Sequence, residues 1–118
     1  MKYLCLIYED RFAGKTLPQA EIEKAMKEYW SFEDSIKQSG HYLGSNALED
    51  TTTATTVRMR NGSLSATDGP FVETKEQLGG YYLIEAKDLN DAIRVASRIP
   101  SAKWGAVEVR PVHEYSRP

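Results

Sequence analysis

The spacing of apolar residues changes along this chain, and the changes predict its elements. Residues 3–8, Tyr-Leu-Cys-Leu-Ile-Tyr, are apolar at every position, which is typical of a strand covered on both faces. From 18 to 39 the spacing becomes three to four residues, which predicts an amphipathic helix. Its stripe consists of Ile22, Ala25, Met26, Tyr29, Phe32, Glu33 and Ile36. Thr16 and Gln19 resemble a capping box at its start, and Gly40 is a natural stop.

The middle of the chain is predicted to form strands. Residues 41–48 give a short strand that Gly44 weakens. Asn61-Gly62 is the preferred two-residue turn of a β-hairpin. Closing the ladder at this turn pairs Arg60 with Ser63, Met59 with Leu64, Arg58 with Ser65 and Val57 with Ala66. The apolar pairs then share one face and both arginines the other. Because a slip of one residue would mix the faces, the register is well specified.

Three further elements complete the predicted fold. Tyr81 to Glu85 form a strand, and Asp88 caps a second helix that Pro100 ends. Residues 106–112 form a last strand, in which apolar and charged residues alternate. The order β-α-β-β-β-β-α-β predicts an α+β fold, a split β-α-β sandwich with an extra β-hairpin. Two helices cover only one face of such a sheet. Since the first strand is apolar on both faces, we expect a homodimer packed sheet to sheet.

The composition is that of one soluble globular domain, residues 1–118. Hydrophobic residues make up 41% and charged residues 27%, which argues against a disordered chain. The net charge is −2, and Lys and Arg are scattered, so we expect no direct nucleic-acid ligand. The apolar run at the N-terminus is too short for a signal peptide or a membrane span. With a single cysteine, Cys5, that is expected to be buried, we predict a cytoplasmic protein without an internal disulfide.

The turn at residues 68–71, Asp-Gly-Pro-Phe, is the first candidate for chemistry. Asp68 ends the second strand of the hairpin, and Gly69-Pro70 forces the chain to turn. Two interpretations stay open for Asp68. It is a turn residue that accepts backbone N–H bonds, or a general base or ligand acceptor at a strand end. Phe71 is expected to anchor this loop on the core.

The charged run that follows has two interpretations as well. Glu73, Lys75 and Glu76 form a solvated face, or they belong to a ligand site. A helical turn would place Glu73 and Glu76 on one side, and Lys75 would then pair with Asp68 or hold an anionic ligand. The pair Gly79-Gly80 indicates a β-bulge or a place where a group comes close to the backbone.

Two candidate residues lie outside this segment. Arg58, on the polar face of the hairpin, suits a ligand that carries a carboxylate, and exposure to solvent explains it equally well. His41 opens the second strand and is a weaker candidate. The two histidines and the cysteine lack the spacing of metal ligands, and no dinucleotide or phosphate-binding fingerprint is present. We therefore expect neither a metal nor a cofactor.

Several stretches resemble one known family. They are "DGPF" at 68–71, "ETKEQLGGYY" at 73–82 and "GAVEVRPV" at 105–112. The chain is similar over nearly its whole length to DGPF-domain proteins of the YCII-related family. The resemblance implies a ferredoxin-like fold, usually a dimeric α/β barrel, and a genetic setting near extracytoplasmic-function sigma factors. In some relatives a His–Asp pair, with the His on the first helix, is thought to do acid–base work. The helix at 18–39 contains no histidine, which counts against that chemistry here.

Three functional hypotheses follow. The first is a domain that binds a small molecule, with an anion as one option, in a cleft near the DGPF motif, where Arg58, Asp68 and the charged run are contacts. The second is a cofactor-independent acid–base enzyme, of the isomerase or lyase type, with Asp68 as the base. The third is a protein-interaction module that serves a sigma factor. The absence of a helix histidine and of a nucleophile favours the first hypothesis over the second.

Overall fold

The computed structural model describes residues 1–10 and 17–118, and its elements follow the predicted order. The described strands and α-helices are β1 (Lys2–Asp10), α1 (Gln19–Gln38), β2 (Tyr42–Ala47), β3 (Thr55–Arg60), β4 (Ser63–Asp68), β5 (Glu76–Glu85), α2 (Leu89–Ser97) and β6 (Ala106–Pro111). Two short 3₁₀ helices, η2 (Thr51–Thr53) and η3 (Pro100–Lys103), also lie in the described part of the chain. The fold is therefore α+β, as the sequence predicts.

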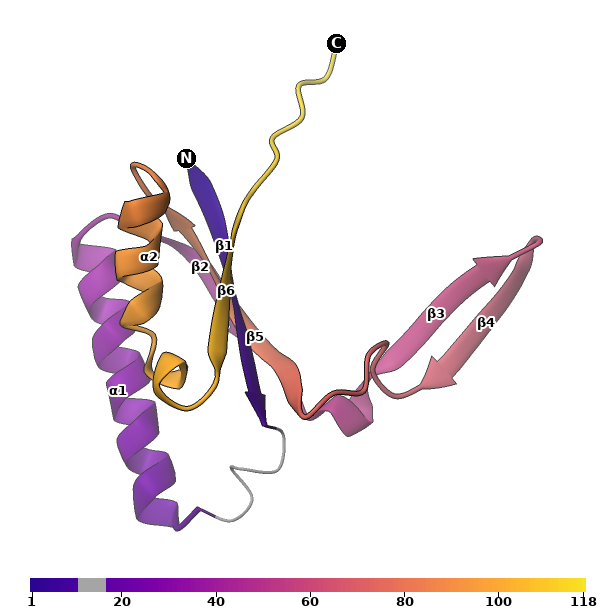
Figure 1. The fold of residues 1–118 in the computed structure, drawn as a ribbon, viewed down its shortest axis with the longest axis horizontal. Coiled ribbons are helices and arrows are strands. Elements are labelled where there is room, and N and C mark those ends of the chain that lie inside the picture. The colour runs from indigo at the N-terminus through magenta and orange to yellow at the C-terminus, as the bar shows by residue number, and fades with distance from the viewer. Residues whose placement is uncertain (11–16) are drawn as a thin grey trace.

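Four strands form one antiparallel sheet in the order β2-β5-β1-β6. The helices α1 and α2 pack on the same face of this sheet (Figure 1), an arrangement compatible with a ferredoxin-like fold. The strand β5 begins five residues earlier than the predicted start at Tyr81, because Glu76–Gly80 continue the ladder with β1. A β-bulge interrupts that ladder between Ile7 and Tyr8, opposite Gly79 and Gly80.

The core lies between the sheet and the helices. From β1 it takes only alternate residues, Tyr3, Cys5 and Ile7, because successive side chains of a strand point to opposite faces. Residues from β5, the two helices and the segment after α2 complete it: Phe32, Ile36, Tyr82, Ile84, Ala86, Ala92, Val95, Ala96 and Ile99. The Cys5 thiol is fully buried, and burial raises its pKa to about 11. Cys5 is thus a small apolar core residue, as expected.

The opposite face of the sheet carries the other apolar residues of the inner strands. The register places Leu4 beside Leu83, Leu6 beside Tyr81 and Tyr8 beside Leu78. We call these six residues the open sheet face. All are partly buried by their neighbours, and no described helix covers them (Figure 1).

The helix α1 is less deeply buried than its stripe predicts. Only Phe32 and Ile36 are buried, whereas Met26 is exposed. Its N-cap is Pro18, which makes no side-chain cap bond; Thr16 of the predicted capping box lies outside the described residues. At the other end, Gly40 adopts φ 81° and ends the helix as expected.

The hairpin of β3 and β4 forms a separate two-stranded sheet with the predicted register. Asn61 and Gly62 have φ values of 51° and 76°, as a type I′ turn requires. The hairpin projects away from the four-stranded sheet (Figure 1), so both of its faces are exposed. The hairpin and the extended C-terminal segment after β6 both project from the fold (Figure 1), and the Cα radius of gyration is 16.5 Å, against about 13–14 Å for a compact domain of this length.

Candidate functional site

The Asp-Gly-Pro-Phe turn is fixed by its backbone. Gly69, at φ 106°, donates its N–H to the carbonyl of Ala54 at 2.8 Å, and Thr56 Oγ1 donates to the carbonyl of Gly69 at 2.9 Å. Asp68 pairs with Thr55 at the end of the hairpin, and its side chain is exposed. Its carboxylate makes no hydrogen bond to any residue that the structure describes. The turn therefore holds without the Asp68 side chain, contrary to the interpretation of Asp68 as the acceptor of the turn.

Phe71 does not anchor the loop on the core, so this prediction was wrong. The side chain is 70% exposed, and its ring lies 5.0 Å from the guanidinium carbon of Arg58. The reason is that the hairpin stands apart from the core, which leaves Phe71 beside the hairpin. Arg58 is thereby positioned by a cation–π contact.

The charged run is not helical, so Glu73 and Glu76 do not share a helical face. Residues 72–75 form an irregular loop, and Glu76 is the first residue of β5. The buried amide of Gln77 holds the loop from within, because its Nε2 donates to the carbonyls of Val72 at 2.9 Å and Thr74 at 2.8 Å. Sequence reasoning missed Gln77, since the strand was predicted to begin after it. The only hint in the sequence was that Gln77 is an uncharged polar residue between Glu76 and the apolar Leu78.

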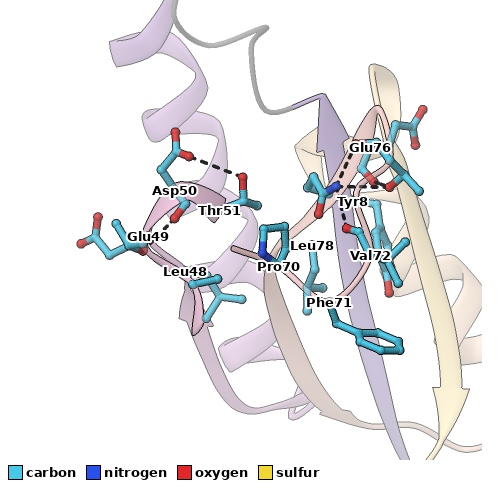
Figure 2. A pocket seen from close by; sticks show the side chains of 14 residues that line it. Tyr8, Leu48, Glu49, Asp50, Thr51, Pro70, Phe71, Val72, Glu76 and Leu78 are labelled. Atoms are coloured by element: carbon cyan, nitrogen blue, oxygen red, sulfur yellow. Dashed lines mark hydrogen bonds between the residues drawn. The ribbon is translucent and has the colours of Figure 1, made fainter. Parts of the chain in front are cut away.

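A cavity of about 690 Å³ lies beside this loop (Figure 2). Its lining combines the end of β2 and η2, the turn, and the start of β5: Tyr8, Leu48, Glu49, Asp50, Thr51, Thr53, Ala54, Pro70, Phe71, Val72, Thr74, Glu76, Gln77 and Leu78. We call this space the DGPF cavity. Because Tyr8 and Leu78 belong to the open sheet face, the cavity opens on that face.

The structure brings only one of the predicted site residues into this lining. Glu76 lines the DGPF cavity, whereas Arg58, Asp68, Glu73 and Lys75 do not. Among the described residues, the lining contains three carboxylates, Glu49, Asp50 and Glu76, and no Lys, Arg or His. Asp50 also caps η2 by accepting a hydrogen bond from Thr52 N at 2.9 Å. This charge distribution does not suit the anionic ligand that Arg58 and Lys75 suggested.

His41 lies elsewhere and has a partner that the sequence did not indicate. Its Nε2 is 3.1 Å from Asp91 Oδ2, and its Nδ1 is 2.7 Å from Ser39 Oγ. Asp91 also accepts the N–H of Lys87 at 3.0 Å. This backbone bond, and next the bond with His41, lower the pKa of Asp91. His41 thus connects the start of β2 to the first turn of α2, and it lines neither the DGPF cavity nor its rim.

The glycine pair has a local explanation. Gly79 sits at the β-bulge, and a Cβ atom on Gly80 would come within 2.9 Å of the carbonyl oxygen of Asn46 in β2. The close approach to the backbone that the sequence indicated is therefore made by a neighbouring strand.

Residues 1–10 and 17–118 contain no group of three or more His, Cys, Asp or Glu side chains placed to hold a metal ion. No helix among them has the length and apolar character needed to cross a membrane.

Comparison with known proteins identifies the family. Residues 1–116 match the family model of the YCII-related domain. A protein of Rhizobium meliloti (strain 1021), which its name describes as uncharacterised, is 34% identical over 117 residues, covering 98% of this chain and 94% of the relative. The two matches agree with the resemblance carried by the Asp-Gly-Pro-Phe turn and the closing strand. The chain belongs to the YCII-related family.

Proposed function

We propose that the protein binds a small, largely apolar molecule in the DGPF cavity, and that it does so as a homodimer. The observation that carries this proposal is the cavity itself. Its volume of about 690 Å³ falls within the range of roughly 300–1,000 Å³ typical of ligand sites. Its walls are mainly apolar, and they include Pro70, Phe71 and Val72 of the motif segment. Gln77 holds the loop in place, so the wall exists before a ligand arrives.

The lining also defines the charge of the ligand. Three carboxylates, with no cationic side chain among the described lining residues, would repel an anion from this space. The ligand is therefore uncharged or cationic, with hydrogen-bonding groups that suit Thr51, Thr53 and Thr74. This replaces the anionic ligand expected from the sequence.

The homodimer is supported by two apolar surfaces. One is the open sheet face, and the other is the hairpin face that carries Val57, Met59 and Leu64, all of them exposed. Apolar surfaces of this kind mark protein contacts in soluble proteins. A second copy packed sheet to sheet would cover the open face and close the DGPF cavity, which opens on it.

The two other hypotheses draw less support. As a base, Asp68 would need to face a substrate, but it does not line the DGPF cavity. A docking module for another protein, such as a sigma factor, would use the same apolar hairpin face as the homodimer. The mass of the protein in solution distinguishes the two: a homodimer has twice the mass of the chain, whereas a docking module without its partner has the mass of one chain.

The assembly is tested by light scattering. We expect twice the chain mass of 13.3 kDa for wild type and the single-chain mass for Leu64→Lys. Ser65→Lys is the matched control, since it places the same charge on the opposite face of the same strand. A monomeric wild type, or equal effects of the two substitutions, would contradict the homodimer.

The cavity is tested with N-phenyl-1-naphthylamine, a neutral probe whose fluorescence rises in apolar surroundings. Ala54→Trp fills the DGPF cavity, whereas Ala20→Trp adds the same side chain to the exposed start of α1. We expect probe binding by wild type and Ala20→Trp and its loss in Ala54→Trp. A saturating ligand, at about 100 times its dissociation constant, should add roughly 2.7 kcal/mol of stability. Unchanged binding by Ala54→Trp would exclude this cavity.

A further inference from the structure

A second cavity, of about 410 Å³, lies between α1 and the sheet. Its lining comes from β1, α1, β2 and β5: Ile7, Glu9, Met26, Tyr29, Trp30, Glu33, Ser45, Asn46, Ala47, Gly79, Gly80, Tyr81 and Tyr82. We call this space the aromatic cavity. The two cavities have no described lining residue in common, so a ligand site here is independent of the function proposed above.

The aromatic cavity carries negative charge from two opposite walls. Glu9 comes from β1 and Glu33 from α1, and no Lys, Arg or His is among the described residues of the lining. The Glu9 carboxylate accepts a hydrogen bond from Ser101 and has no ion-pair partner among the described residues. The Glu33 carboxylate accepts from Ser45 Oγ at 3.1 Å and pairs with Lys37 Nζ at 3.3 Å. Glu9 is therefore the less compensated of the two charges.

The Tyr82 hydroxyl is an unused polar group at this cavity. Tyr82 is only 6% exposed, and its ring packs edge-on against Phe32 at 5.2 Å. The hydroxyl makes no hydrogen bond to a residue that the structure describes. No fully buried polar side-chain atom in the described chain lacks a partner, so this hydroxyl is in contact with open space. Burial, and next the charge of Glu33, raise the pKa of Tyr82, which keeps the hydroxyl neutral and able to donate.

Aromatic rings complete the lining. Tyr29 contributes to it, and Trp30 is 57% exposed although it belongs to the wall of the cavity. Aromatic faces attract cations, and carboxylates in a partly desolvated space do so more strongly than in water. Both features reject anions. An apolar amine meets these conditions because its charge suits the carboxylates and its body suits the rings and Met26.

We propose that the aromatic cavity binds a small primary amine with an apolar or aromatic body. Glu9 and Glu33 provide the counter-charge, the Tyr82 hydroxyl provides a hydrogen bond, and Trp30 covers the apolar part. The volume of the cavity lies at the lower end of the range for ligand sites, which suits a molecule with one ring.

The test compares three probes with the same phenyl group: phenethylamine, 2-phenylethanol and phenylacetate. Calorimetry on the full-length protein should show that phenethylamine binds at least about tenfold more tightly than the alcohol, and that phenylacetate does not bind. In a Trp104→Phe background, the fluorescence of Trp30, the remaining tryptophan, should change on binding. Equal affinities for the amine and the alcohol, or no amine binding up to millimolar concentration, would overturn the proposal.

Variants assign the binding to the named residues. Glu9→Gln keeps a hydrogen-bond acceptor for Ser101 and should weaken phenethylamine binding by about tenfold or more. Tyr82→Phe keeps the ring in the core and should weaken it several-fold. Glu23→Gln, on the exposed side of α1, is the matched control and should leave the affinity unchanged. Wild-type affinity in Glu9→Gln, or equal weakening by Glu23→Gln, would overturn the assignment.

Discussion

A Cβ atom on Gly80 would stand 2.9 Å from the carbonyl oxygen of Asn46, closer than real Cβ atoms come to a backbone oxygen. The neighbouring Gly79 has open space at the same position. Two adjacent glycines of the same strand thus differ completely in what surrounds them. Gly80 is paired directly with Ala47 of β2, next to Asn46, whereas Gly79 lies at the β-bulge between β5 and β1.

Gly80→Ala should therefore be destabilising and Gly79→Ala should not. The added methyl of Gly80→Ala meets backbone rather than a flexible side chain, so the strands must separate, at a cost of about 1–3 kcal/mol. Gly79→Ala is the matched control, with an expected change within about 0.5 kcal/mol. Urea unfolding of the two variants measures both values. Equal losses would show that bulge geometry, and not the approach of Asn46, restricts this site.

Gln77→Leu should loosen the loop before β5. The substitution leaves the carbonyls of Val72 and Thr74 without their donor, and each lost bond costs about 0.5–1.5 kcal/mol, because both carbonyls belong to exposed residues. Hydrogen exchange should show lower protection in the segment 72–78, together with weaker probe binding in the DGPF cavity. Lys75→Gln changes an exposed residue of the same loop and should alter neither quantity. Normal protection in Gln77→Leu would mean that other contacts hold the loop.

Ionisation of Asp91 should make the free energy of unfolding depend on pH in the acid range. The folded state lowers the pKa of Asp91, so the ionised carboxylate stabilises the fold. This contribution is fully present above the pKa of the unfolded chain, about 3.9, and is lost as the pH falls through the lower pKa of the folded state. Wild type should therefore exceed Asp91→Asn in stability at pH 7, and the two should converge below about pH 4.

Unfolding curves at several pH values measure this convergence. Asp34→Asn, on the exposed side of α1, should retain the pH dependence of wild type. If the difference between wild type and Asp91→Asn stayed constant from pH 7 to pH 3, the bonds from Lys87 and His41 would act without regard to the charge of Asp91.

Ile36→Ala should be among the most destabilising core substitutions. Ile36 is fully buried, and the helix end directly after it is fixed by the bond from His41 N to the Ile36 carbonyl. Loss of the buried methyl groups and the remaining cavity cost about 2–5 kcal/mol. Met26→Ala, an exposed member of the predicted stripe, should cost much less. Similar losses in thermal or urea unfolding would mean that the apolar stripe of α1 is covered along its whole length in solution.

The local elements were predictable because their signals lie within a few residues. Asn61-Gly62 determines the hairpin register, since only a turn with positive φ at both positions closes it without strain. Asp88 determines the start of α2, where its side chain accepts the N–H of Asp91 at 2.8 Å. Spacing also identified the long first helix and Gly40 as its end.

The same reasoning failed where a side chain's surroundings come from distant parts of the chain. From its neighbours in the sequence, the apolar Phe71 is predicted to lie in the core. In the structure it follows the projecting hairpin, and its ring contacts Arg58 instead. The strand β5 was predicted too short because the glycine pair suggested an interruption. In the structure the strand continues through a β-bulge there and pairs with β1 on both sides of it. Among the candidate residues, only Glu76 reaches the DGPF cavity, since the hairpin carries Arg58 and Asp68 away from it.

The sequence by itself determined the order of the elements, the register of the hairpin, the buried thiol of Cys5 and membership of the YCII-related family. The structural features among these depend on spacing, turn chemistry or capping, which act between near neighbours, and the family follows from the motifs and the match over residues 1–116. Only the tertiary structure decided that Gln77 holds the motif loop, that His41 meets Asp91 and that Tyr82 faces a cavity with Glu9 and Glu33. His41 and Asp91 are 50 positions apart, and Tyr82 meets Glu9 and Glu33 only because the helices pack on one face of the sheet. The bonds of Gln77 reach only three and five positions back, but they depend on β5 beginning at Glu76, which its pairing with β1 decides.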